Sequence, residues 1–159
     1  MTDAEYEAQK ARIEALIERW VKPIGLGWWK LNFVYERSGV DFTDGKVEHG
    51  SGLTTQVLAV TLADWQYCYA TIKWNLSQTL DETDDNLEYG FVHELMHVFV
   101  HEMRVWHQKE ASEFLNSVER EHEERVCTTL AKGFIWMRDH VCEEIEKKYK
   151  GCLCLACLR

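Results

Sequence analysis

The chain has 159 residues, of which 46% are hydrophobic and 12% aromatic, so it is long enough for one domain with a substantial core and too short for two. We therefore expect a single domain over residues 1–150 and a separate cysteine-rich tail over residues 151–159. The net charge of −9 argues against a protein that holds duplex nucleic acid, because such proteins neutralise phosphates with lysine and arginine.

The N-terminus and the hydropathy pattern predict a soluble, cytoplasmic protein. Residues 1–5, Met-Thr-Asp-Ala-Glu, are acidic where a secretory signal would be basic and then apolar. No uninterrupted apolar run approaches the roughly 20 residues of a membrane span. We therefore expect no membrane contact, and thiols that stay reduced.

The six cysteines divide into two groups by position. Three lie within expected regular elements and are predicted to be reduced thiols: Cys68, Cys127 and Cys142. The other three crowd the C-terminal tail: Cys152, Cys154 and Cys157. No partner cluster elsewhere has structural zinc spacing, so we interpret the tail as a frayed, oxidisable segment rather than a soft-metal site.

The first half of the chain predicts a helix followed by strands. Residues 2–21 read as an amphipathic helix, with Thr2 and Glu5 in position for a capping box. Residues 28–36 alternate as a half-buried strand does, and residues 56–62 and 69–76 have the branched and apolar content of two more strands. The bend between the last two, around Asp64, is either a simple turn or a short helical turn. These elements predict a small, mostly antiparallel sheet of about three strands.

The second half predicts two helices, the first of which carries the sequence His93-Glu94-Leu95-Met96-His97. Residues 84–86 offer an N-cap, Glu88 stands three positions after Asp85, and apolar residues follow at helical spacing. On a helix the two histidines fall one turn apart on one face, with Glu94 beside them. This is half of a zinc site together with the usual position of its general base.

A long second helix is predicted over residues 116–149, while residues 102–113 carry no pattern that assigns a structure. Catalytic zinc usually has three protein ligands and one open position, so the third ligand must come from elsewhere. Helical rise places His101 about 12 Å from His93, too far to share one ion. Glu123 and Glu124 lie on the second helix, and either is a candidate unless both belong to a solvated charge run.

At this point the chain resembles the gluzincin metallopeptidases. In that family the glutamate ligand on the second helix is followed by a polar residue at +4 and a small residue at +7. Glu124 fits this register, with Thr128 and Ala131 at those positions, although many gluzincins have Asn or Asp where Thr128 stands. The whole arrangement looks like the compact zincin-like proteins of phages and prophages. The resemblance covers roughly residues 25–135.

The resemblance implies an α+β, zincin-like domain with an N-terminal helix, a small sheet, an active-site helix and a long C-terminal helix. It implies Zn²⁺ on His93, His97 and Glu124, and a water molecule that Glu94 deprotonates to hydrolyse peptide bonds. The expected partner is a peptide or protein substrate, inside a bacterium or a phage-infected host cell. By analogy with zincins, residues 69–76 would pair with an extended peptide through a free strand edge.

Two other interpretations stay open. The segment from Trp106 to Phe114 faintly resembles the histidine loop of SprT-like DNA-associated proteases, which would make His107 the third ligand, although Gln108 stands where that loop has glycine. Alternatively, zinc has a structural or interaction role in a phage protein without catalysis. Four residues are candidates for stabilising an oxyanion: Tyr89, His107, His122 and Arg125.

Overall fold

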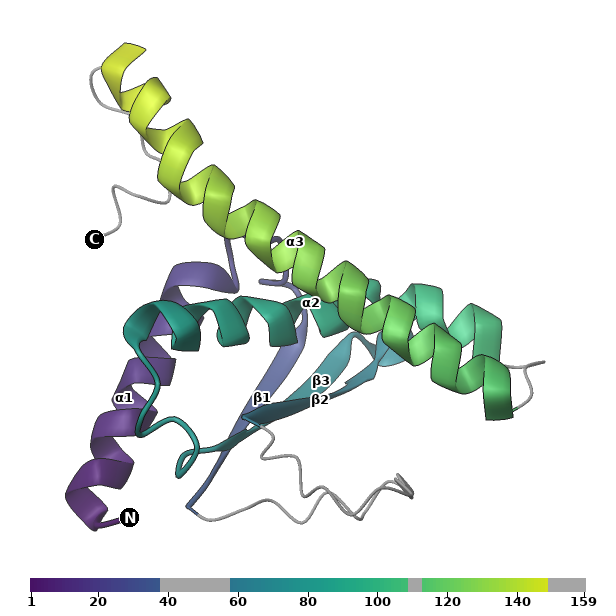
Figure 1. Ribbon diagram of the computed structural model, residues 1–159, viewed down its shortest axis with the longest axis horizontal. Coiled ribbons are helices and arrows are strands. Elements are labelled where there is room, and N and C mark those ends of the chain that lie inside the picture. Colours follow the sequence, from purple (N-terminus) through teal and green to yellow (C-terminus); the bar gives the residue numbers. More distant parts are fainter. Residues whose placement is uncertain (38–57, 109–112, 149–159) are drawn as a thin grey trace.

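The computed structural model describes residues 1–37, 58–108 and 113–148, apart from the side chains of residues 65, 102–108, 113–120 and 141–148. Its elements are three helices, a short 3-10 turn and three strands that form one sheet (Figure 1). In chain order they are α1 (Asp3–Trp20), β1 (Lys30–Glu36), β2 (Ala59–Asp64), η2 (Trp65–Tyr67), β3 (Tyr69–Asn75), α2 (Asp84–Gln108) and α3 (Glu113–Lys148). The predicted α+β composition is therefore confirmed. The cysteine-rich tail, with Cys152, Cys154 and Cys157, lies outside the described residues.

Helix α1 begins with the predicted capping box. The Thr2 hydroxyl accepts a hydrogen bond from the backbone N–H of Glu5, and the Glu5 carboxylate accepts one from the backbone N–H of Thr2. Both bonds satisfy N–H groups that have no partner inside the helix. The buried face of α1 includes Ile13, Leu16 and Trp20, which join the hydrophobic core.

The sheet is mixed, and its strand order is β1-β3-β2. Strand β1 pairs with β3 in parallel, while β2 pairs with β3 in the antiparallel direction. The expectation of a mostly antiparallel sheet is therefore only half right. Strand β3 is central because its alternate residues Ala70, Ile72 and Trp74 are all fully buried, which suits a strand with neighbours on both sides. The prediction that residues 69–76 offer a free edge to a peptide is wrong.

Helix α2 packs against the sheet through stacked aromatic rings. The ring of Phe91 lies 5.8 Å from that of Trp74 on β3 and 6.0 Å from that of Phe33 on β1, nearly parallel to both. Leu95 and Met96 on α2 are also fully buried. This packing fixes one face of α2 on the sheet and leaves the adjacent face for α3, which crosses α2 diagonally and projects beyond it in Figure 1.

The start of α2 differs from the prediction. Thr83 caps the helix, since its hydroxyl accepts a hydrogen bond from the backbone N–H of Asn86 at 3.2 Å. Glu88, expected to complete a capping box with Asp85, is instead 6% exposed. The helix also continues to Gln108 and includes residues 102–108, which the sequence left unassigned.

Glu88 links all three helices. Its carboxylate accepts hydrogen bonds from Arg19 of α1 at 2.9 Å and from the Trp20 indole at 2.7 Å, and pairs with Arg138 of α3. Burial raises the pKa of Glu88, but the hydrogen bonds from Arg138, Arg19 and Trp20 outweigh burial and leave the pKa below its usual value. The buried charge is therefore paired, and it sets how α3 lies against α1 and α2.

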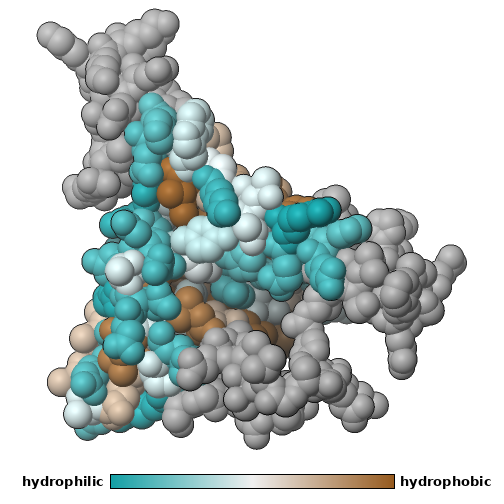
Figure 2. Space-filling model, viewed as in Figure 1, coloured by the Kyte–Doolittle hydropathy of each residue, from teal (hydrophilic) through white to brown (hydrophobic). Residues whose placement is uncertain are grey.

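Hydrophilic residues predominate over α1 and the middle of α3 on the face drawn in Figure 2, interrupted by smaller hydrophobic patches. None of the described helices is long and apolar enough to cross a membrane.

Candidate metal centre

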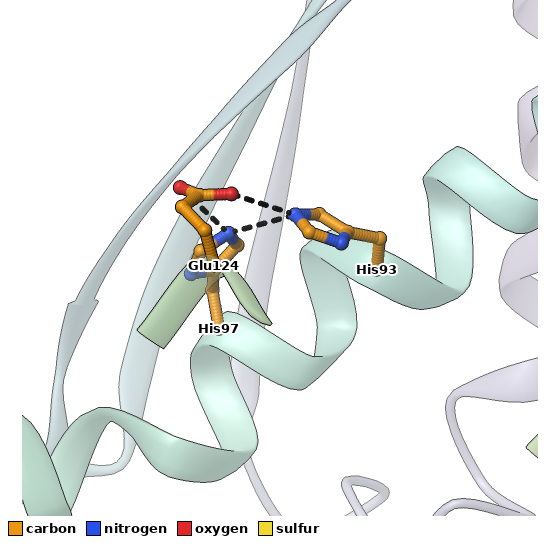
Figure 3. Close-up of side chains that lie close together, drawn as sticks. All are labelled: His93, His97 and Glu124. Atoms are coloured by element: carbon orange, nitrogen blue, oxygen red, sulfur yellow. Dashed lines mark hydrogen bonds and ion pairs between the residues drawn. The ribbon is translucent and has the colours of Figure 1, made fainter. Parts of the chain in front are cut away.

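Helices α2 and α3 bring together His93, His97 and Glu124 (Figure 3). The two histidine Nε2 atoms are 3.1 Å apart. The Glu124 carboxylate lies 3.2 Å from Nε2 of His93 and 3.5 Å from Nε2 of His97. Two imidazole nitrogens and a carboxylate oxygen within this space form the kind of ligand set that binds zinc with one position left open. The register that favours Glu124 thus corresponds to a real convergence of side chains.

The other ring nitrogens of the two histidines are held by α3. Nδ1 of His97 is 2.9 Å from the carboxylate of Glu123, and Nδ1 of His93 is 3.5 Å from the hydroxyl of Thr128. An Nδ1–H that donates to an oxygen leaves the Nε2 lone pair directed at a metal. Glu123 and Thr128 therefore orient the rings, and Thr128 occupies the +4 position that the sequence singled out.

A cationic His97 is strongly favoured when no metal is bound. Burial lowers the pKa of His97, but hydrogen bonds with Cys127, Glu123 and Glu124 raise it to about 12. Because burial raises the pKa of the Cys127 thiol, that group is uncharged near neutral pH, and the two carboxylates supply the stabilising charge. Hydrogen bonds with His93 and His97 hold the pKa of Glu124 far below its usual value. The two carboxylates thus make the site negatively charged, so that it can bind either a proton or a metal cation.

Glu94 points toward β2. The Thr61 hydroxyl lies 2.6 Å from the Glu94 carboxylate and donates to it. Burial raises the pKa of Glu94, and the hydrogen bond from Thr61 and the nearby His97 and His93 offset this only in part. A half-buried carboxylate with a raised pKa, next to a candidate metal site, has the properties of a general base.

An open pocket of about 420 Å³ is lined by one of the three converging side chains, His93. Its lining residues are Leu58, Glu82, Asn86, Tyr89, Gly90, His93, Glu94 and Thr128. A Cβ on Gly90 would stand 2.9 Å from the Leu58 side chain, so the absence of a side chain at this position lets Leu58 pack closely against α2 in the pocket wall. Both His93 and Glu94 are therefore reachable from outside.

The four candidates for oxyanion stabilisation fall in different places. Tyr89 lines the pocket, and its ring centroid is 6.3 Å from that of His93. His122 and Arg125 are exposed on α3 and do not line the pocket. His107 lies on the last turn of α2, ten residues after His97, which is about 15 Å along a continuous helix. That separation is too large for His107 and His97 to bind the same ion.

A second set of potential ligands shares His97. Its members are His97, Glu123 and Cys127, and the Cys127 thiol is 3.5 Å from Nδ1 of His97. Cys127 is fully buried, and neither it nor Glu123 lines the pocket. This set is the more buried of the two, because the Glu123 side chain is 9% exposed, whereas the Glu124 side chain is 48% exposed and its partner His93 lines the pocket beside Glu94.

Sequence reasoning missed Thr61 and the contact of Cys127 with His97. Thr61 shares its strand face with Ala59 and Ala63, so a hydroxyl among inward-facing small apolar residues was the available signal. Cys127 lies one helical turn after Glu123, a spacing that places both on one face of α3.

Protein-family models, curated proteins and solved structures were each compared with the chain, and none matches it. The chemistry of the site must therefore be argued from its own geometry.

Proposed function

We propose that the protein is a zinc-dependent metallopeptidase. The observation that carries the proposal is the convergence of His93, His97 and Glu124 beside the half-buried carboxylate of Glu94, with His93 and Glu94 lining an open pocket. Mixed imidazole and carboxylate ligands suit zinc, and three protein ligands leave a fourth position open, as in catalytic sites. Zinc held by these residues would lower the pKa of a bound water to about 7 and, as a Lewis acid, would polarise the carbonyl oxygen of the substrate.

Glu94 is the general base in this proposal. Its carboxylate accepts the proton of the attacking water and passes it to the amide nitrogen that leaves. The hydrogen bond from Thr61 fixes the carboxylate and opposes the rise in pKa that burial causes. Thr61 therefore lowers the pH above which Glu94 is ionised and able to accept a proton.

The strand proposed to bind substrate is β2 rather than β3. Strand β2 pairs with β3 on one side only within the described residues, so its other side is an edge of the sheet. Thr61 on this strand contacts Glu94, which places the edge next to the reacting groups. An extended peptide that adds to this edge through main-chain hydrogen bonds would pass the metal centre.

The second candidate function is a structural metal site without catalysis. The set of His97, Glu123 and Cys127 supports it, because structural zinc sites are closed and often contain cysteine. In that case the pocket beside Glu94 has no role in the chemistry. The two functions differ in ligand set and in activity, so they can be distinguished directly.

The test compares the parent with Glu94→Gln for zinc content and for hydrolysis of a varied peptide library. We expect the parent to hold one zinc and to cleave, and the variant to keep the zinc and lose about 10²–10⁴-fold in rate. Glu121→Gln, which alters an exposed carboxylate on α3, is the matched control and should resemble the parent. A zinc-loaded parent that cleaves no peptide supports the structural role, and equal activity of Glu94→Gln excludes Glu94 as the base.

A further inference from the structure

The pocket beside the metal centre follows one face of α2. Four of its lining residues, Asn86, Tyr89, Gly90 and His93, are spaced three, four and seven positions apart, so they share one side of the helix. The rise from Asn86 to His93 is about 10 Å. The pocket is therefore a groove with the metal centre near one end and Glu82, just before the first turn of α2, near the other.

Glu82 offers a carboxylate that the fold does not use for capping. Its Oε2 accepts a hydrogen bond from the Asn86 amide at 3.1 Å, which holds the group in place. Thr83, and not Glu82, caps the helix. Within the described parts of the chain, no lysine or arginine pairs with the Glu82 side chain, and none lines the groove.

Arg12, a cation that contacts the backbone of Glu82, is already engaged. Arg12 donates to the Asp84 carboxylate at 2.6 Å and to the backbone carbonyl of Glu82 at 2.9 Å. It also donates to the backbone carbonyl of Thr79 at 3.3 Å. The guanidinium thus interacts with Asp84 and with main-chain oxygens, so among the side chains that the structure describes no cation pairs with the Glu82 carboxylate.

We propose that Glu82 binds a cationic group of the substrate, an ammonium or a guanidinium, at the far end of the groove. The proposal rests on the proposed peptidase function and adds a substrate class to it. About 10 Å corresponds to three residues of extended peptide, or to a lysine or arginine side chain together with part of the main chain. The cationic group can therefore belong to a basic side chain or to a free α-amino terminus, because both carry the charge that the Glu82 carboxylate attracts.

The experiment measures binding and cleavage separately with peptides that differ in a single cation. In the first pair both peptides have an acetylated N-terminus, and they differ in having lysine or norleucine at one position. In the second pair both peptides have norleucine at that position, and they differ in having a free or an acetylated N-terminus. Each is tested with the zinc-loaded parent, with Glu82→Gln and with Asp81→Asn, an exposed neighbouring carboxylate outside the groove lining. Equilibrium binding is measured by fluorescence anisotropy of labelled peptides, and cleavage by chromatography.

We expect the parent to favour the cationic member of at least one pair about tenfold in binding at low salt, as for one partly exposed charge-assisted contact. The preference should fall toward about one in Glu82→Gln and persist in Asp81→Asn, and the pair that shows it identifies the source of the cation. Equal binding of cationic and neutral peptides, or no peptide binding at all, would overturn the subsite. A preserved binding preference without cleavage would contradict the peptidase reaction alone.

Discussion

Replacing Glu124 and Glu123 separately by alanine is expected to weaken zinc binding to different extents. Glu124 approaches Nε2 of both histidines, so its removal deletes a ligand. Glu123 contacts His97 at Nδ1, the ring nitrogen away from Glu124, so its removal deletes a group that orients a ligand. The order of the two losses therefore reports which side of the His97 ring faces the metal.

The expected magnitudes follow from these contacts. Loss of a group that orients a metal-binding histidine typically costs 10–100-fold in affinity. For Glu123→Ala the loss should be near the low end, about tenfold or ~1.4 kcal/mol, because Glu123 also stabilises the proton on His97 that zinc must displace. Glu124→Ala should exceed 100-fold, since no other described carboxylate faces both Nε2 atoms.

The assay is competition for zinc against a chromogenic chelator at fixed pH. His107→Ala is a useful third variant, because the α2 backbone places residue 107 about 15 Å from His97 along the helix axis, and its affinity should equal that of the parent. A larger loss for Glu123→Ala than for Glu124→Ala would refute the assignment and point to the set that contains Cys127. Equal zinc binding by all three variants would reject every ligand set considered.

Three further outcomes are expected. Thr61→Val removes the hydrogen bond that lowers the pKa of Glu94, so the acidic limb of the pH profile of kcat/KM should move to higher pH. An acidic limb at the same pH as in the parent would exclude Glu94 as the titrating base. The pKa of metal-free His97 is raised to about 12, so zinc must displace a proton from this ring at neutral pH, and zinc affinity should rise up to about tenfold per pH unit between about pH 6 and 8. Calorimetry in buffers of different ionisation enthalpy counts the protons released, and zinc binding without proton release would contradict this prediction. Glu88→Gln breaks a buried ion pair and should lower the free energy of unfolding by about 3 kcal/mol in urea titrations, whereas a loss below about 1 kcal/mol would show that the pair contributes little.

The features that could be predicted from the sequence are those determined by residues close together in the chain. The capping box of Thr2 and Glu5 and the helix around His93 and His97 are set by residues within a few positions of one another, so composition and spacing suffice. Glu124 was expected only through the resemblance to gluzincins, whose register on the second helix it fits, and α3 does pack against α2.

What the sequence did not predict depends on contacts distant in the chain. The central place of β3 depends on its pairing with both β1 and β2, and the full burial of Ile72 and Trp74 on one of its faces depends on α2 covering the sheet. Glu88 matched a capping pattern, but the guanidinium of Arg138, fifty residues later, is a stronger partner for its buried carboxylate. The side chains of Glu123 and Glu124 separate onto two edges of the same imidazole, which spacing along one helix does not reveal.

The central claim is that His93, His97 and Glu124 hold a metal beside Glu94. Anomalous scattering at the zinc edge, from crystals of the zinc-loaded protein, tests it most directly. The account predicts one peak about 2.0–2.2 Å from Nε2 of both histidines and from the Glu124 carboxylate, on the side of the pocket. A peak about 2.3 Å from the Cys127 sulfur and next to Nδ1 of His97, or no peak at either place, would contradict it.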